Sequence, residues 1–289
     1  MYIQTIFFSF LLSSFSFAID APGFRHSGNS ALSWFAPHHS ASDVLTVSGR
    51  EAALNAKFSY GPMHKDLEDE DIQLWLGTCE NKLVSLGIFK TDSDGRLLTT
   101  LSGINKTGTY KICMLVSGDN TSTEFTLRIL DPNTRLAIFD LDGTLTRGNI
   151  DFRPREGAPE ITQVLKISGL EIIYLSGRHY FLTRMTRNLL SDNGFAEGSL
   201  IVGQSLHDIV PIESNVGIFK ENYLKYLKDL GLILDRAYGD SKTDIYAYQE
   251  VQIPNTQIFT LGENSGYKGS TGLGEDYLQH LQDLARLPK

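Results

Sequence analysis

The sequence has little basic charge, few cysteines and no repeats. Its 289 residues contain 26 Lys and Arg against 34 Asp and Glu, which gives a formal net charge of -8. No long basic run is present to follow a nucleic-acid backbone, so we expect no nucleic-acid partner. With 41% hydrophobic and 21% charged residues, the chain can bury a core of ordinary size, and two domains are the natural expectation.

Cysteine occurs twice, as Cys79 and Cys113. In an oxidising compartment a bond between them would close a loop and stabilise the fold by roughly 3–4 kcal/mol. The alternative is a pair of buried free thiols. No cysteine lies directly after the predicted cleavage site at Ala18, so nothing marks a lipoprotein.

The N-terminal segment lacks charge altogether. Residues 1–18 contain no charged side chain, include an apolar run from Ile6 to Leu12, and end at Ser16-Phe17-Ala18. This pattern predicts a signal peptide cleaved after Ala18, and hence export to a periplasm, a secretory lumen or the medium. The absence of Lys and Arg from the first residues is atypical of a signal peptide. A retained N-terminal membrane anchor is the alternative, although a spanning helix needs roughly 20 apolar residues and serine interrupts this run.

The rest of the chain divides into segments that differ in composition and hydrophobic periodicity. Residues 19–42 carry Gly, Ser, Pro and His without periodicity, which predicts a poorly ordered linker. Residues 43–131 alternate polar and apolar positions in short runs at 72–76, 110–116 and 124–129, with turn-forming residues at 92–95 and 117–120. Such spacing indicates a small antiparallel β-sandwich domain.

Residues 132–289 follow a different pattern, in which short apolar runs alternate with helical segments. The expected strands lie at 136–139, 171–175, 199–202, 236–238 and 257–261, and the expected helices at 160–166, 180–192, 220–230, 243–250 and 275–286. This alternation predicts an α/β fold with a doubly wound parallel sheet, in which sites form at the carboxyl ends of the strands. The last helix is expected to dock on the protein rather than on a membrane.

Two carboxylates follow a fully apolar strand. Leu136 to Phe139 lead directly into Asp140 and Asp142. Acidic side chains at the exit of a buried strand are costly unless a cation or hydrogen bonds compensate them. Hard oxygen ligands beside an expected phosphate favour Mg²⁺ as the cofactor.

Here the sequence resembles the haloacid dehalogenase (HAD) superfamily, whose first motif is Asp-x-Asp-Gly-Thr. Further candidates follow in the order that the family keeps, at Ser176-Gly177-Arg178, at Lys220 and at Gly239-Asp240-Ser241-Lys242-Thr243-Asp244. The resemblance implies a Rossmann-like fold without a large cap, because the intervals between the motifs are short. Residues 132–289 would then be a HAD-like catalytic domain.

The resemblance also implies roles for these residues. Asp140 would attack phosphorus to form an aspartyl-phosphate, and Asp142 would act as acid and then base. The metal residues would be Asp140, Asp142 through its backbone carbonyl, Asp240 and Asp244. Those for the substrate would be Thr144, Ser176, Gly177, Arg178 and Lys220. Ser176 has the alternative role of a helix cap, and Arg178 that of a solvated ion pair. Lys225 and Lys228 compete with Lys220 for its role.

A closer resemblance lies in the residues around these motifs. The stretches at 58–62, 92–97, 116–121 and 238–240 look like the C-terminal (LNS2-like) module of membrane-associated phosphatidylinositol transfer proteins, and 219–220 and 246–248 look like lipin phosphatidate phosphatases. The transfer proteins lack the first catalytic Asp and are taken to bind phosphatidate, whereas both Asp140 and Asp142 are present here. The expectation is therefore a magnesium-dependent phosphomonoester hydrolase acting on a phosphorylated small molecule or a lipid phosphate such as phosphatidate, with membrane-surface contact. The alternatives are a non-catalytic phosphatidate-binding module and a phosphotransferase.

Overall fold

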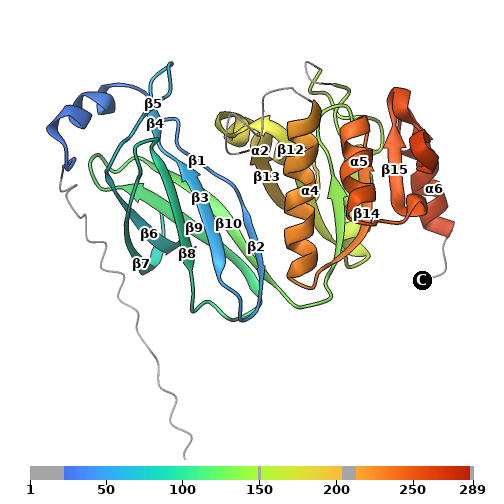
Figure 1. Ribbon diagram of the computed structural model, residues 1–289, viewed down its shortest axis with the longest axis horizontal. Coiled ribbons are helices and arrows are strands. Elements are labelled where there is room, and N and C mark those ends of the chain that lie inside the picture. Colours follow the sequence, from blue (N-terminus) through green and yellow to red (C-terminus); the bar gives the residue numbers. More distant parts are fainter. Residues whose placement is uncertain (1–22, 149–150, 204–212, 287–289) are drawn as a thin grey trace, which may run out of the picture.

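The computed structural model describes residues 23–148, 151–203 and 213–286 (Figure 1). The expected signal peptide at 1–18 lies outside the described residues. In the described ranges, no helix combines the length and the apolar character needed to cross a membrane. Where the sequence predicted a poorly ordered linker, the structure has a 3-10 helix, η1 (Ser27–Trp34), and a short strand, β1 (Ser40–Ala41).

The first module is a sandwich of two sheets, drawn from blue to green in Figure 1. Its strands after β1 are β2 (Val44–Val47), β3 (Ala52–Lys57), β4 (Ser59–Tyr60), β5 (Lys65–Asp66), β6 (Asp71–Gly77), β7 (Lys82–Lys90), β8 (Arg96–Leu101), β9 (Gly108–Val116) and β10 (Ser122–Leu130). The sheets have the orders β1-β3-β8 and β2-β10-β9-β6-β7, and β4 and β5 form a separate hairpin. All pairings in the module are antiparallel except β2 with β10, which is parallel. The three strands that the alternating pattern predicted at 72–76, 110–116 and 124–129 are confirmed as β6, β9 and β10.

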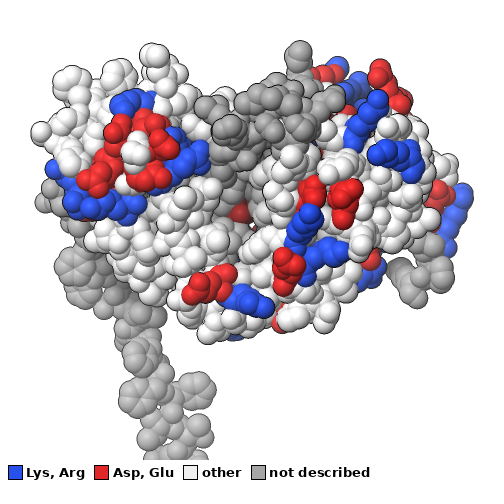
Figure 2. All heavy atoms as spheres, viewed as in Figure 1, with Lys and Arg blue, Asp and Glu red and all other residues white. Residues whose placement is uncertain are grey.

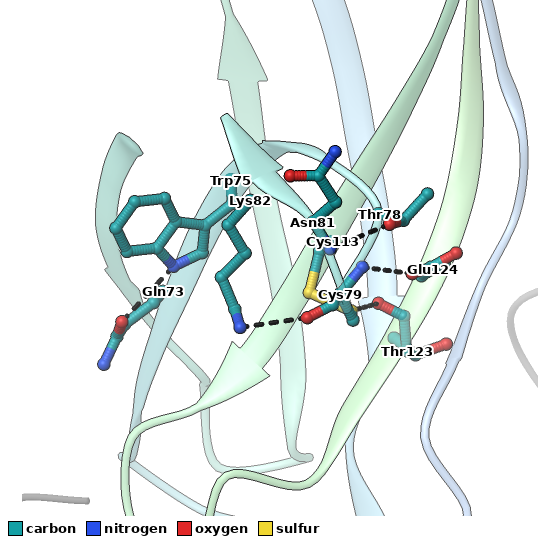
Figure 3. The surroundings of a disulfide bond; sticks show 9 residues. All are labelled: Gln73, Trp75, Thr78, Cys79, Asn81, Lys82, Cys113, Thr123 and Glu124. Atoms are coloured by element: carbon teal, nitrogen blue, oxygen red, sulfur yellow. Dashed lines mark hydrogen bonds between the residues drawn. A yellow bond between two sulfur atoms is a disulfide. The ribbon is translucent and has the colours of Figure 1, made fainter. Parts of the chain in front are cut away.

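A disulfide joins Cys79 to Cys113 (Figure 3). Cys79 follows β6 and Cys113 lies in β9, with a Cα–Cα distance of 4.9 Å. The Cys79 backbone N–H donates to the Glu124 carboxylate on β10, and the Lys82 ammonium donates to the Cys79 carbonyl at 2.9 Å. The bond therefore ties the β6–β7 turn to the middle of the five-stranded sheet, and the free-thiol alternative is excluded.

The second module, drawn from green to red, contains a six-stranded sheet of order β13-β12-β11-β14-β15-β16 in which every pair is parallel (Figure 1). Its strands are β11 (Arg135–Phe139), β12 (Glu171–His179), β13 (Ser199–Gly203), β14 (Ile233–Gly239), β15 (Ile258–Leu261) and β16 (Thr271–Gly274). Its helices are α1 (Ala158–Ile167), η2 (Tyr180–Leu182), α2 (Thr183–Asp192), α4 (Glu213–Asp229), α5 (Lys242–Glu250), η3 (Asn255–Gln257), η4 (Gly262–Asn264), η5 (Tyr267–Gly269) and α6 (Leu278–Arg286). Strand β11 is apolar because both of its faces are covered, and Leu136 to Phe139 are all 0% exposed. The five strands and five helices predicted here are confirmed, whereas β16 was missed.

The fold class predicted from the sequence is wrong for the molecule. The chain is mostly β structure, a β-sandwich followed by a parallel sheet, rather than an α/β protein, and a Rossmann-like HAD arrangement is not established. The α/β part of the prediction rested on the strand and helix alternation of residues 132–289, whereas the small β-sandwich predicted before it is present. The sandwich contributes ten strands and no α-helix, and the connection from β15 to β16 contains only the 3-10 turns η4 and η5.

Strand β2 joins the two modules. Its Leu45 and Val47 belong to the same buried cluster as Leu136 and Ile138 of β11. Just before β2, the buried side chain of Asp43 accepts hydrogen bonds from backbone N–H groups on β10 and β13 and from Arg187 on α2. We call the contacts of Asp43 the joint. The sandwich and the parallel sheet therefore share one buried cluster, beside the separate cluster inside each module.

Candidate cation and phosphate site

The loop after β11 brings Asp140 and Asp142 to the carboxyl edge of the parallel sheet. The Asp140 backbone N–H donates to the Tyr238 carbonyl on β14 at 3.0 Å, which fixes the start of the loop. Gly143 follows with φ +81°, and a Cβ on it would lie 2.0 Å from Asp240 Oδ2. The motif requires glycine here because Asp240 of the neighbouring strand end must approach the backbone closely.

Three of the predicted acidic residues meet at this edge. Asp140, Asp240 and Asp244 each offer a carboxylate oxygen, and these oxygens lie within 4.8 Å of one another. Thr144 Oγ1 donates to Asp140 and to Asp240, at 3.2 Å each. We call Asp140, Asp240 and Asp244 the acidic cluster. Its hard oxygen donors fit a small divalent cation such as Mg²⁺.

The ammonium group of Lys220 lies within the acidic cluster. Its Nζ lies 2.5 Å from Asp140 Oδ1 and also donates to Asp244, and its side chain is 3% exposed. Although burial opposes the charged form, these two carboxylates raise the pKa of Lys220. Burial, together with the charges of Asp244 and Asp240, raises the pKa of Asp140 against the effect of Lys220. Three carboxylates against one ammonium leave negative charge that a bound cation would neutralise.

Asp142 lies apart from the cluster, in an ion pair with Arg178. Arg178 Nη2 and Nε donate to the two oxygens of Asp142 at 2.6 and 2.8 Å, and Nη1 donates to Thr186 at 3.0 Å. The Arg178 side chain is 4% exposed, so it is not a solvated surface pair. Both oxygens of the Asp142 side chain thus accept hydrogen bonds from one guanidinium. Binding of a cation by its backbone carbonyl stays a prediction.

A cavity of about 590 Å³ opens at these residues. Its lining residues are Asp140, Asp142, Gly177, Arg178, Val216, Lys220, Asp240, Ser241, Lys242, Thr243, Asp244, Glu263 and Asn264. A hollow of the same volume on the sandwich is lined by residues 53–55 and 98–100 and has no charged side chain, so it does not suit an anion. The cavity therefore brings most of the predicted site residues together.

Two predicted residues lie behind the lining rather than in it. Thr144 is buried and bridges two carboxylates, as described above. Ser176 is 1% exposed, and its Oγ accepts from the Arg178 backbone N–H at 3.1 Å, which stabilises the irregular end of β12 rather than capping a helix. Direct contact of Ser176 with a substrate stays a prediction.

Further residues at the site were not predicted, among them Lys242, Asn264 and Arg155. Lys242 lines the cavity from the first turn of α5, and Asn264 donates to the Asp240 carbonyl at 2.7 Å. Arg155 Nε donates to the Gly143 carbonyl at 2.7 Å. Lys242 lay within a motif already recognised and could have been proposed from it. Asn264 and Arg155 do not directly follow a predicted strand, so there was no reason in the sequence to propose them as site residues.

Comparison with known proteins finds two matching family models and several relatives. Residues 37–129 match the family described as PITM 1-3, beta-sandwich domain, and residues 137–262 match PITM 1-3, LNS2 domain. Protein retinal degeneration B of Drosophila melanogaster is 29% identical over 261 residues, which are 86% of this chain and 20% of that protein. Membrane-associated phosphatidylinositol transfer protein 1 of Rattus norvegicus is 28% identical over 260 residues, with the same coverage, and the human protein 3 is 27% identical over 259 residues, with 26% of its length covered. The chain thus spans about a fifth to a quarter of these relatives.

These matches correct the activity predicted from the sequence. Two of these relatives are named membrane-associated phosphatidylinositol transfer proteins, which are lipid transfer proteins rather than HAD phosphatases, so the assignment as a magnesium-dependent hydrolase is wrong. The error came from treating retained carboxylates as evidence of turnover, whereas the same carboxylates suit a site that only binds. The chain contains an LNS2-like module that follows a sandwich similar to the beta-sandwich domain of PITM 1-3 proteins.

Proposed function

We propose that the chain is a non-catalytic module that binds the phosphomonoester headgroup of phosphatidate in the cavity, together with Mg²⁺ at the acidic cluster. The cation would be held by Asp140 and Asp240, with Asp244 behind them, and would supply positive charge to the phosphate oxygens. Lys220 and Lys242 would add positive charge from the protein side. The names of the phosphatidylinositol transfer protein relatives support a phospholipid as the ligand.

The observation that carries this proposal is the bidentate pair of Arg178 with Asp142. An acid in catalysis must reach the leaving oxygen with a proton, and a carboxylate that accepts from Arg178 with both oxygens has no oxygen free for that task. Asp140 is engaged in the same way, because Oδ1 accepts from Lys220 and Oδ2 accepts from Thr144. Asp140 thus lies beside Lys220 in the acidic cluster, where a cation would bind, and Asp142 holds Arg178 at the cavity wall.

The test is co-sedimentation with phosphatidylcholine vesicles that contain either phosphatidate or an equal charge of phosphatidylserine. We expect binding to phosphatidate vesicles in Mg²⁺, loss of that binding in EDTA, and no release of inorganic phosphate. Asp240→Asn should weaken binding about tenfold or more, because it removes a charged ligand of the cation. Asp283→Asn, which changes an exposed carboxylate on α6, is the matched control. Equal binding to both kinds of vesicle, or release of phosphate, would contradict the proposal.

A further inference from the structure

A line of exposed apolar side chains starts at the cavity and crosses from the second module to the sandwich. We call it the apolar strip, and its members are Phe152, Phe181, Met63 and Phe35, which are 39%, 44%, 92% and 53% exposed. Large exposed apolar side chains that lie singly need no explanation, whereas a contiguous set beside a ligand cavity indicates a contact surface. Whether these four are contiguous is decided by their contacts.

The contacts of the strip begin at the cavity wall. The Phe152 ring lies over the Arg178 guanidinium, with 4.9 Å between the Arg178 Cζ and the ring centroid. His179 follows Arg178 in the chain, and its ring stacks on that of Phe181, with a centroid distance of 4.3 Å. Phe152 therefore borders the cavity through Arg178, and the consecutive residues Arg178 and His179 connect it along β12 to Phe181.

The strip then continues onto the sandwich. The Phe181 ring lies 5.1 Å from that of His64 in the turn between β4 and β5, directly after Met63. In the same turn Gly61 lies against the Phe35 side chain, because a Cβ on it would be 3.4 Å from Phe35 Cβ. Figure 1 shows the β4–β5 hairpin and α2 on opposite sides of the junction between the modules, and in Figure 2 the uppermost side chains of the sandwich are uncharged.

We propose that the apolar strip is the membrane-docking surface of the protein, and that its occupant is an anionic phospholipid bilayer. The proposal rests on the proposed function, because a phosphatidate headgroup stays at the bilayer surface and can enter only a cavity whose mouth reaches that surface. Phe and Met side chains bury their apolar parts at the boundary of headgroups and acyl chains. Arg184, exposed in the first turn of α2, adds positive charge beside the strip, which suits an anionic bilayer.

A protein partner is the other occupant that such a surface could take. The continuity of the strip with the cavity favours the bilayer, because docking and headgroup capture would then occur at one surface. The β4–β5 turn belongs to the sandwich and η2 to the second module, and the buried Ser40 on β1 of the sandwich ties η2 to that module by donating to the Tyr180 carbonyl at 2.8 Å. The two halves of the strip can therefore meet one flat surface together.

The test changes Met63, whose side chain is almost fully exposed, so that its substitution leaves the core intact. We expect Met63→Asp to weaken binding to vesicles of phosphatidylcholine and phosphatidate about tenfold or more, which corresponds to about 1.4 kcal/mol. Met63→Trp should strengthen it. Ile167→Asp is the matched control, because Ile167 is 84% exposed at the end of α1, outside the strip, and its binding should equal that of the wild type.

A second measurement separates the strip from the cavity. Binding of a water-soluble, short-chain phosphatidate, followed by calorimetry, should be unchanged in Met63→Asp, because that ligand needs no bilayer contact. If Met63→Asp binds vesicles as the wild type does, or if the wild type binds no vesicles, the docking surface is refuted, whatever the soluble lipid shows. If the wild type ignores the soluble lipid and its vesicle binding still depends on Met63, the headgroup proposal fails and the docking surface stands.

Discussion

The joint at Asp43 predicts that the two modules unfold as one unit and that Asp43→Asn strongly destabilises both. The Asp43 side chain is 1% exposed. Its oxygens accept from the Thr126 backbone N–H at 2.7 Å, from the Leu200 backbone N–H at 2.8 Å and from Arg187 Nη1 at 2.9 Å. These donors come from β10, β13 and α2, so one carboxylate connects both modules.

The loss of stability in Asp43→Asn follows from the hydrogen bonds and the charge that asparagine cannot supply. It keeps the volume and one acceptor oxygen, but its amide NH₂ would face an N–H donor and its charge is gone. Removal of one partner from a buried ion pair costs about 3–5 kcal/mol, and we take about 3 kcal/mol because the Arg187 side chain is 29% exposed and can regain water. For a chain of this size each kcal/mol lowers the melting temperature by roughly 2–4 °C, so we expect a decrease of about 6–12 °C.

The assay is thermal unfolding followed by circular dichroism and by calorimetry. The wild type should show one transition, because the buried cluster around β2 contains residues of both modules. Asp192→Asn, which changes an exposed acid at the end of α2, should melt within about 1 °C of the wild type. Two separate transitions in the wild type, or an Asp43→Asn variant that melts with the control, would refute the reasoning.

Three further predictions concern stability and binding. Lys220→Met should abolish binding of the short-chain phosphatidate in calorimetry, because it leaves the acidic cluster without its ammonium, whereas Lys225→Met on the exposed side of the same helix should bind normally; equal affinities would contradict this. Burial lowers the pKa of His280 to about 4, so the unfolded chain takes up its proton first as the pH falls from about 6.5. The stability that neutral His280 contributes is thus complete above about pH 6.5 and is lost as the pH falls toward 4, with a loss of about 1–2 kcal/mol at pH 5. The free energy of unfolding of His280→Gln, measured in urea, should therefore depend less on pH over this range. Reduction of the disulfide between Cys79 and Cys113, which are 34 residues apart, should cost roughly 4 kcal/mol, measured as a lower urea midpoint, and an unchanged midpoint would contradict its structural role.

Local patterns determined where the elements lie. Strand β11 could be placed because Leu136 to Phe139 are continuously apolar, and strands buried on both faces require that. The same logic placed the site, since parallel strands present their carboxyl ends at one edge and bring Asp140 and Asp240 together. β16, with the sequence Thr-Gly-Leu-Gly, has no such run and was missed.

Only the tertiary structure decided how the side chains pair. Arg178 lies 36 residues from Asp142 in the sequence, and its capture of both oxygens of that carboxylate depends on the packing of the two strand ends. Asp43 had no local pattern at all, because its donors come from three distant elements. Periodicity is a property of neighbouring residues, and it therefore encodes helices, strands and strand ends. Ion pairs and joints between modules depend on distances across the fold, which a sequence does not contain.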